Sequence, residues 1–255
     1  MGYYNLSTEE RAEINANIQH ELQEGANNKE LHSYVEYFSD DDTYIRKAGY
    51  LAVGRIYSAV ISLRKDLLNI LFSLKEHPNE LVRQTVVNAA GEIGMFQFDV
   101  VAPIFDDALF DEHHRVRNAV IGSVKKMSKR NPNPTLKWTK KYLTHPQPEV
   151  RREVCHGIEL RGRTHPQDIL PLLKVLQHDT IKRVRDTLVH VIGQISYKKG
   201  CLATVISALN TWENKALVFD AVTEIIDVHS EKRYAGFSAL TQEEVITCIT
   251  EKLKN

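Results

Sequence analysis

Apolar side chains recur along this chain in short amphipathic segments, and the same segment returns at a nearly constant interval. An apolar residue directly precedes an arginine four times at steps of 34 residues, at Val82-Arg83, Val116-Arg117, Val150-Arg151 and Val184-Arg185. The pair Ile45-Arg46 precedes this series by 37 residues, and Val218-Phe219 continues it after a further 34. Self-similarity at a period of roughly 20 to 50 residues is typical of a helical solenoid. We therefore expect six copies of one helical unit.

Each unit carries the stripe of an amphipathic helix. Apolar residues return three and seven positions after the arginine position, at Val86 and Ala90, Val120 and Val124, Val154 and Ile158, Leu188 and Ile192, and Val222 and Ile226. Together with the preceding Val or Ile, they form one face of a helix. Six positions before the arginine position stand residues that favour turns or helix starts, namely Asp40, His77, Asp111, His145, Asp179 and Glu213.

The pattern predicts helix pairs joined by short connections rich in Pro, Asn and Asp. The predicted pairs are 28–38 with 43–58, 66–75 with 80–96, 99–110 with 114–129, 134–143 with 148–162, 166–177 with 181–197, and 201–211 with 215–229. They group into repeats at about 28–60, 64–97, 98–130, 133–163, 165–198 and 200–230. No linker divides the chain, so we expect a single domain over 1–255.

Two capping boxes predict the terminal helices. Ser7 with Glu10 begins an N-terminal helix, which we expect to end at Gly25. After residue 230 the repeat pattern lapses, and Thr241 with Glu244 begins a last helix. A terminal helix over 240–254 is expected to cap the apolar end of the solenoid.

Two prolines complete the repeat pattern. Pro103 and Pro171 each stand 14 residues before a repeat arginine and inside a predicted helix, where proline removes a backbone donor and bends the helix. With the turn aspartates and the arginines, this spacing resembles the HEAT repeat. The resemblance implies an all-α fold, a right-handed α-solenoid of about six HEAT-like repeats with terminal capping helices. It also implies that the second helix of each pair lines the concave surface.

Composition excludes several classes of protein. The chain is 42% hydrophobic and 26% charged, and no apolar run approaches the ~20 residues of a membrane span. Its first residues, MGYYNLSTEERAE, are acidic and polar and give no secretory signal, so we expect a cytoplasmic protein. The three cysteines are scattered without a CxxC spacing, which favours buried reduced thiols and no zinc site.

Charge is balanced overall and uneven along the chain. Residues 113–200 carry 19 Lys and Arg against 6 Asp and Glu, a net charge of +13, whereas residues 1–112 have a net charge of −10 from 9 basic and 19 acidic residues. A basic block of this size indicates a site for DNA or another polyanion.

The polar positions of the second helices give the candidate site. We expect nucleic acid to be bound by residues at the positions outside the apolar stripe and by basic residues next to them. These are Lys125, Lys129, Arg152, His156, Arg163, His190 and Lys198. Gly54 and Gly91, eight positions after the arginine, are expected to let a partner approach the backbone.

The repeat arginines allow two interpretations. Arg46, Arg83, Arg117, Arg151 and Arg185 could form a track of cations for phosphates. In HEAT repeats this arginine typically pairs with turn aspartates, so we favour a structural ladder bonded to Asp40, Asp111 and Asp179. Arg83 and Arg151 have histidine in their own turn, which makes them the arginines expected to be freest.

A closer resemblance covers His145 to Ser196. The shared elements are His145-Pro146 leading to Val150-Arg151-Arg152, Gly157, the run HPQDILPLLKVLQHD from His165 to Asp179, and Val184-Arg185 leading to Ile195-Ser196. This stretch is similar to the bacterial HEAT-like DNA alkylation repair glycosylases. The similarity implies DNA as a partner and removal of alkylated bases such as 3-methyladenine.

The chain departs from that family where the chemistry would lie. In the branch of the family that fits this stretch best, a glutamate and an aspartate serve catalysis, and the corresponding positions here are His156 and Gln194. The tryptophan-bearing loop expected after Gly157 is replaced by IELRGR. Excision of a cationic base needs a carboxylate to stabilise positive charge on the sugar. Glu92 and Glu159 are the remaining catalytic candidates, and we interpret both as ordinary surface charges. We therefore favour a protein without catalytic activity. If it is an enzyme, we expect a DNA glycosylase that acts on alkylated purines.

Other catalytic motifs are missing from the sequence. It contains no P-loop, GxGxxG or HExxH, and most histidines are expected in turns, so we predict neither a cofactor nor a metal site. The leading hypothesis is a HEAT-like protein that binds DNA or another nucleic acid through a basic concave surface, and the family resemblance implies a link to DNA alkylation repair. The alternative is a non-catalytic scaffold that binds an acidic protein or peptide. Neither hypothesis involves a membrane.

Overall fold

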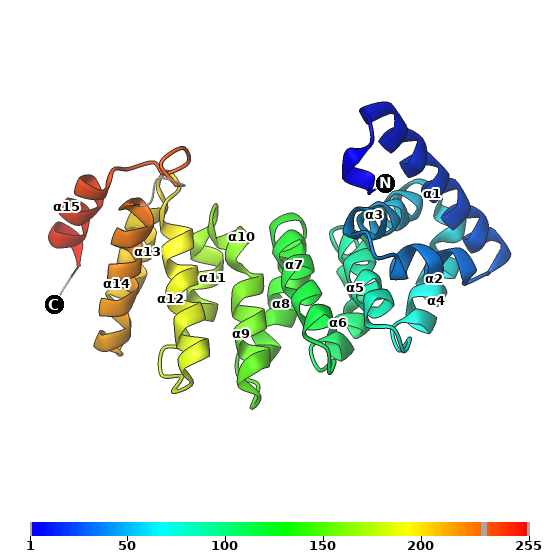
Figure 1. Cartoon of the computed structure of the whole chain (residues 1–255). Coiled ribbons are helices and arrows are strands. Elements are labelled where there is room, and N and C mark those ends of the chain that lie inside the picture. Colours follow the sequence, from blue (N-terminus) through cyan, green and yellow to red (C-terminus); the bar gives the residue numbers. More distant parts are fainter. Residues whose placement is uncertain (1, 231–233, 254–255) are drawn as a thin grey trace. The chain divides into compact units, whose positions relative to one another are not determined.

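The protein is built from consecutive α-helices, as the computed structural model shows for residues 2–230 and 234–253 (Figure 1). No β-strand occurs within these two ranges. The helices form two compact units, residues 1–131 and 132–255. The expected all-α fold of HEAT-like helical repeats is confirmed, whereas a single domain stays a prediction. None of the helices in the described ranges is both long enough and apolar enough to cross a membrane.

The first unit holds an N-terminal helix and three helix pairs. Its helices are α1 (Thr8–Asn28), α2 (His32–Ser39), α3 (Thr43–Ala59), α4 (Arg64–Leu74), α5 (Glu80–Gly94), α6 (Ala102–Ala108) and α7 (His114–Arg130). Helices α1, α3, α5 and α7 pack one on the next, and the shorter α2, α4 and α6 pack against them from the other layer. This is the two-layer arrangement expected of stacked helical repeats.

The second unit repeats this arrangement. Its helices are α8 (Pro132–Tyr142), α9 (Pro148–Gly157), α10 (Glu159–Gly162), α11 (Pro166–Lys174), α12 (Lys182–Ser196), α13 (Cys201–Leu209), α14 (Lys215–Ser230) and α15 (Gln242–Lys252). In Figure 1, α9, α12 and α14 stand side by side, and α11 and α13 form the other layer. Helix α15 packs on α13 and α14 as the predicted C-terminal cap, and residue 254 of the predicted range lies outside the described residues.

Both predicted capping boxes are present, and one predicted helix end is wrong. Ser7 and Glu10, and likewise Thr241 and Glu244, exchange hydrogen bonds between side chain and backbone. Helix α1 continues through Gly25 to Asn28, and Lys29 with a φ of 61° ends it. Gly25 is buried, and a Cβ atom at this position would lie 2.8 Å from the Ser33 hydroxyl oxygen. The glycine therefore serves close packing rather than helix termination.

The predicted apolar stripe is buried in the second to fifth repeats, as for Val86, Val120, Val154 and Leu188. The sixth repeat differs, because Val222 and Ile226 are partly exposed while Leu217, Ala221, Ile225 and Val228 are buried. Helix α14 contains two apolar series one residue apart, and the extrapolated repeat spacing selected the wrong one.

Two details of the predicted helices also change. Pro103 lies in the first turn of α6, where a missing N–H donor costs little, so it does not kink this helix; Pro171 lies inside α11 as expected. The helix predicted over 148–162 is interrupted at Ile158, which separates α9 from α10.

The repeat arginines are structural, as favoured, but their partners differ from the expectation. Arg83 donates from Nε and Nη2 to the carboxylate of Asp111 at 2.7 and 3.0 Å, and Arg151 donates to Asp179 at 2.6 and 3.1 Å. Each aspartate lies 28 residues downstream, in the turn of the following repeat. The two arginines expected to be freest are therefore held bidentately by carboxylates.

The other three arginines of the ladder bind differently. Arg46 and Arg117 donate to backbone carbonyls of their own turns, including those of Asp40 and Asp111. Arg185 pairs with the carboxylate of Asp220 at 2.7 Å. The ladder therefore ties helices to turns, as expected of a structural element, and the bonds of Arg46 and Arg117 to their own turns include backbone carbonyls.

Candidate functional site

A packing slot recurs between neighbouring second helices. It lies eight positions after the repeat arginine, and three repeats fill it with glycine: Gly54, Gly91 and Gly193. A Cβ atom at these glycines would lie 2.6 Å from Glu92 Cβ, 2.5 Å from Ser123 Oγ and 2.5 Å from Glu224 Cγ respectively. Gly54 and Gly91 thus face the next repeat, and the expectation that they admit a binding partner is wrong.

The fourth repeat places a carboxylate, Glu159, at the position of this slot. Helix α9 ends at Gly157, Ile158 turns the chain, and Glu159 begins the short helix α10, which packs on α12. The residue is only 1% exposed, so its interpretation as a surface charge is wrong. A buried carboxylate is costly unless charged or polar groups bind it, and its partners define the site.

Glu159 belongs to a continuous chain of polar contacts that we call the Glu159 network: His156, Glu159, Arg163, Gln194 and Tyr234. Arg163 Nη2 donates to Glu159 Oε1, and His156 Nε2 lies 3.1 Å from Glu159 Oε2. Arg163 Nη2 also donates to Gln194 Oε1 at 3.0 Å, and Gln194 Nε2 donates to the Tyr234 hydroxyl at 2.9 Å. Gln194 is buried, and its neutral amide bridges Arg163 and Tyr234.

His190 joins this network from α12. Its ring stands nearly perpendicular to that of His156, with the centroids 5.9 Å apart, and its Nδ1 lies 3.5 Å from Glu224 Oε1. One nitrogen of each histidine and one oxygen of Glu159 lie within 4.8 Å of one another. The two histidines are 34 residues apart, so the repeat itself brings equivalent positions of adjacent helices together.

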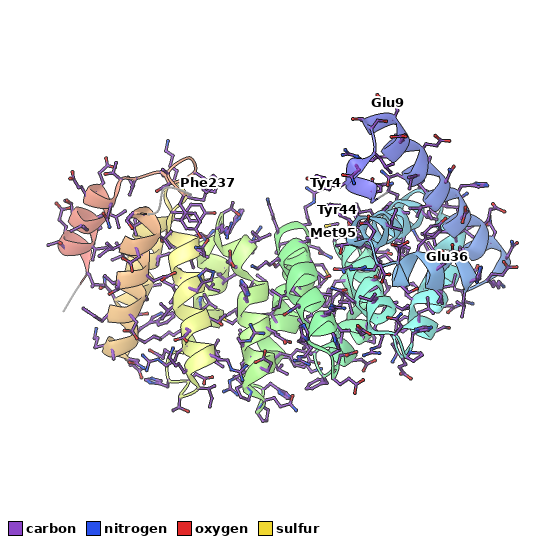
Figure 2. All side chains as sticks on the ribbon, in the orientation of Figure 1. Tyr4, Glu9, Glu36, Tyr44, Met95 and Phe237 are labelled. Atoms are coloured by element: carbon purple, nitrogen blue, oxygen red, sulfur yellow. The ribbon has the colours of Figure 1, made fainter. Side chains whose placement is uncertain are left out.

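An aromatic cluster of Tyr197, Tyr234 and Phe237 borders the network. Its ring centroids are 5.8 to 6.2 Å apart, and Phe237, on the segment that precedes α15, is 51% exposed (Figure 2). The Arg163 guanidinium lies 5.5 Å and Lys198 Nζ 5.7 Å from the centroid of the Tyr197 ring. Burial raises the pKa of the Tyr197 hydroxyl, which therefore stays neutral at physiological pH.

The remaining predicted site residues fall in different places. Arg152 pairs with Glu149 at 2.6 Å and approaches Glu153 at 3.7 Å, so carboxylates of its own helix already engage it. Lys125 and Lys129 lie on α7, in the first unit. Of the seven predicted binding residues, the structure brings together His156, Arg163 and His190 around Glu159, with Lys198 at the neighbouring Tyr197 ring.

Glu92, the other catalytic candidate, is also buried, with 9% of its surface exposed. Lys126 Nζ lies 2.6 Å from its carboxylate and 5.1 Å from the centroid of the Tyr50 ring. The residue is therefore one half of an ion pair between α5 and α7, and the expectation of a surface charge is wrong here too.

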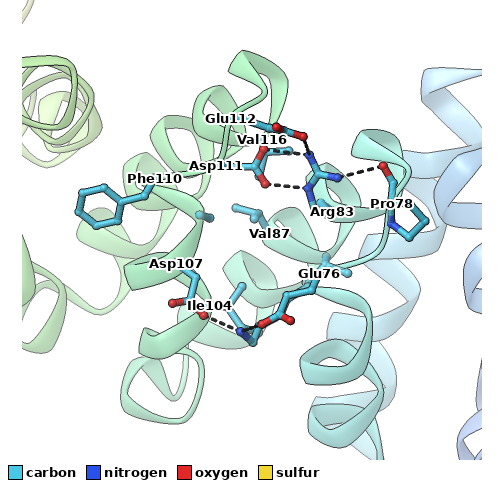
Figure 3. A pocket seen from close by; sticks show the side chains of 13 residues that line it. Glu76, Pro78, Arg83, Val87, Ile104, Asp107, Phe110, Asp111, Glu112 and Val116 are labelled. Atoms are coloured by element: carbon cyan, nitrogen blue, oxygen red, sulfur yellow. Dashed lines mark hydrogen bonds and ion pairs between the residues drawn. The ribbon is translucent and has the colours of Figure 1, made fainter.

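A cavity of about 540 Å³ opens in the first unit, lined by α5, α6, α7 and the turns that follow α4 and α6 (Figure 3). Its cations are held by carboxylates, because Lys75 pairs with Glu76 and Asp107 at 2.7 Å and Arg83 pairs with Asp111. None of the seven predicted binding residues lines it. The cavity therefore surrounds the ion pair between Arg83 and Asp111, which belongs to the arginine ladder.

The sequence pattern did not identify three groups of this site: Glu224, Tyr234 and Phe237. Glu224 lies on α14, where the repeat spacing selected the wrong apolar series. Tyr234 and Phe237 lie where the repeat pattern lapses, and only the two aromatic residues within a non-repeat segment could have indicated a role.

Comparison with known proteins supports the fold. No protein-family model and no curated protein matches the sequence. Among solved structures, AlkD2 from Streptococcus mutans matches with a TM-score of 0.56 and 14% identity over 74% of this chain and 93% of its own. A chain from the Pds5–Scc1 complex matches with a TM-score of 0.51 and 13% identity over 88% of this chain and 40% of its own. At such identities the likeness concerns the fold alone, for which the predicted HEAT-like resemblance is confirmed.

Proposed function

We propose that this protein binds nucleic acid through a surface of its second unit. This aromatic-cationic surface consists of Tyr197, Tyr234 and Phe237 with Arg163 and Lys198. The observation that carries the proposal is the placement of two cations against an aromatic cluster whose outermost ring, Phe237, is half exposed. Nucleic-acid strands are bound by this combination, because cations pair with phosphates and bases stack on rings.

The charge of the surrounding segment supports the proposal. Residues 132–200 hold 13 Lys and Arg against 6 Asp and Glu, a net charge of +7. Several of these cations are held by carboxylates within the unit, but Lys198 beside the Tyr197 ring and the following Lys199 are both exposed. A positive surface attracts the phosphate backbone regardless of sequence.

The aromatic cluster favours a strand whose bases are accessible. A base that stacks on an aromatic side chain contributes about 1–3 kcal/mol, and this stacking requires an unpaired or extruded base. We therefore propose that single-stranded DNA, or duplex DNA with a disrupted base pair, binds more tightly than intact duplex DNA. Alkylated DNA is a further candidate ligand because of the sequence resemblance over 145–196 and the fold likeness to AlkD2.

Base excision is not part of this proposal. Glu159 is connected to the aromatic cluster through Arg163, and Arg163 and His156 already bind both of its oxygens. A carboxylate neutralised in this way gives less stabilisation to positive charge on a sugar than an unpaired one. We propose recognition of the nucleic acid, with any catalysis to be tested separately.

Fluorescence anisotropy with labelled DNA tests the proposal. Phe237→Ala should weaken binding of single-stranded DNA about tenfold, because the lost base stacking contributes roughly 1–3 kcal/mol. Phe219→Ala is the matched control, because Phe219 is 70% exposed on α14 of the same unit and belongs to no aromatic pair described for the cluster. Equal effects of the two substitutions would contradict the proposed surface.

The same assay separates nucleic acid from the alternative partner. A labelled polyglutamate peptide replaces DNA as a model of an acidic protein segment. Binding of the peptide without binding of any DNA would overturn the proposal in favour of a protein scaffold. These assays are run in EDTA, so that bound metal ions cannot contribute to the result.

A further inference from the structure

We propose that His156, Glu159 and His190 form a binding site for a divalent transition-metal ion with the preferences of Zn²⁺. The site does not depend on nucleic-acid binding. Its residues come from two successive repeats, and the sequence contains no HExxH motif that would indicate them as metal ligands.

The donor set is one that zinc uses. Two imidazoles and one carboxylate supply three ligands and leave a fourth position open, as in catalytic zinc sites. Two ligands come from the α9–α10 junction and the third comes from the adjacent helix α12. A site assembled from two packed helices is fixed by the fold rather than by a flexible loop.

The distances are close to those that a metal requires. Ligand atoms around a tetrahedral zinc with bonds of about 2.0–2.1 Å stand roughly 3.3 Å apart. His156 Nε2 and Glu159 Oε2 are already 3.1 Å apart, and all three ligand atoms fit within 4.8 Å. His156 and His190 are both partly exposed, so rotation of their side chains can close the remaining gap without moving the backbone.

Neighbouring groups hold the ligands in place. Glu224 Oε1, 3.5 Å from Nδ1 of His190, can accept its N–H and orient the ring, a role that carboxylates commonly take beside metal-binding histidines. Arg163 binds the Oε1 atom of Glu159, whereas His156 lies next to Oε2. The metal would therefore share Glu159 with Arg163, one on each oxygen.

The local charge is compatible with a dication. Glu159 and Glu224 contribute two negative charges and Arg163 one positive charge, so these three groups together carry a net charge of −1. Arg163 opposes the metal and reduces its affinity, while Glu224 attracts it.

The repeat architecture explains why the two histidines meet. Both stand five positions after the repeat arginine, and equivalent positions on adjacent second helices face the same direction. The third repeat has Gly122 at this position, where no described side chain lies within 4 Å of an added Cβ atom. Among the third to fifth repeats, only the fourth and fifth thus supply neighbouring imidazoles.

Titration of the full chain with Zn²⁺ alone, after removal of metal by EDTA and dialysis, tests the proposal. Isothermal titration calorimetry should give one equivalent of bound Zn²⁺, and Co²⁺ should give the visible absorption of a four-coordinate site. His156→Ala and His190→Ala should each weaken binding at least tenfold, as expected for the loss of one of three ligands. His178→Ala is the control, because this exposed histidine also lies beside a carboxylate, 3.4 Å from Glu213.

Two outcomes would overturn the site. One is a wild-type chain that binds less than a tenth of an equivalent of Zn²⁺ or Co²⁺. The other is a His156→Ala/His190→Ala double variant that still binds one equivalent, which would place the ion elsewhere. Both histidines are partly exposed, and circular dichroism will confirm that the variants fold. DNA binding is measured in EDTA, so failure of the metal site and failure of the nucleic-acid surface give separate results.

Discussion

Arg151 holds the carboxylate of Asp179 through two N–H donors, and it does so from the preceding repeat. Arg151 Nη1 also donates to the carbonyls of His145 and Pro146 in its own turn. One side chain therefore joins the turns of two successive repeats. Arg83 and Asp111 form the same arrangement in the first unit. Such an ion pair stabilises the fold more than an ordinary surface ion pair does, because it is bidentate and mostly withdrawn from water.

Removal of one member of this pair should destabilise the second unit. Arg151→Met leaves Asp179 without its bidentate partner, and breaking a largely buried pair is expected to cost about 2–4 kcal/mol of unfolding free energy. Arg185→Met is the control, since the Arg185 and Asp220 side chains are 35% and 48% exposed against 14% and 6% for Arg151 and Asp179. The control should cost less than about 1 kcal/mol. Urea unfolding followed by circular dichroism measures both, and equal losses would refute a special role for Arg151.

The same pair should make stability depend on acid pH. Burial opposes ionisation of Asp179, but the bonds from Arg151 and from the Ile181 N–H outweigh it and lower the pKa of Asp179. A lowered folded-state pKa contributes stability above the unfolded-state pKa of about 3.9, and this contribution is lost as the pH falls through the folded value.

Asp179→Asn provides the measurement of this pH dependence. The difference in unfolding free energy between wild type and Asp179→Asn should be largest near neutral pH and should shrink below about pH 4. A difference that stays constant from pH 7 to pH 3 would show that the Asp179 carboxylate contributes no pH-dependent stability.

The fold was predictable because it repeats. The stripe that includes Val86 and Val154 recurs often enough to fix the helix pairs, and the capping residues Ser7 and Thr241 mark the terminal helices. Errors arose where tertiary packing overrides a local signal. Gly25 is a typical stop residue, but contact with Ser33 and Tyr34 keeps it inside α1.

The candidate site was only partly predictable. His156, Arg163 and His190, three of the seven nominated residues, lie close together because equivalent positions on neighbouring helices are adjacent. It could not predict that Glu159 is buried, since the burial depends on the break at Ile158 and on packing against α12. Tyr234 lies outside the repeat pattern altogether.

The packing slot predicts opposite effects for two similar substitutions. Gly54→Ala would place Cβ 2.6 Å from Glu92 Cβ, so overpacking should cost about 1–3 kcal/mol. Gly122→Ala lies on a helix with nothing within 4 Å of its Cβ, and the better helix propensity of alanine should stabilise the protein by about 0.5–1 kcal/mol. Thermal unfolding of both variants checks the sign. Stabilisation by Gly54→Ala would show that the two helices can separate at little cost.

Base excision gives a separate test of Glu159. We expect wild-type protein to release no 3-methyladenine or 7-methylguanine above the buffer background, because Arg163 and His156 already occupy both carboxylate oxygens. Release is measured chromatographically from methylated DNA, with Glu159→Gln and Glu92→Gln prepared alongside. Release by wild type and Glu92→Gln that disappears in Glu159→Gln would establish Glu159 as catalytic and our interpretation of its pairing as wrong.

The salt dependence of DNA binding tests the central claim most directly. Affinity of wild-type protein for single-stranded DNA, measured from about 50 to 300 mM salt, should fall with a slope of about −0.7 per phosphate contacted in a plot of log K against log salt. Lys198→Ala/Lys199→Ala removes two exposed cations, one of them against the Tyr197 ring, and should make this slope less negative by about 1.4. Phe237→Ala should lower the affinity and leave the slope unchanged. A wild-type affinity that does not change with salt, or no detectable binding at the lowest salt, would contradict nucleic-acid binding by this surface.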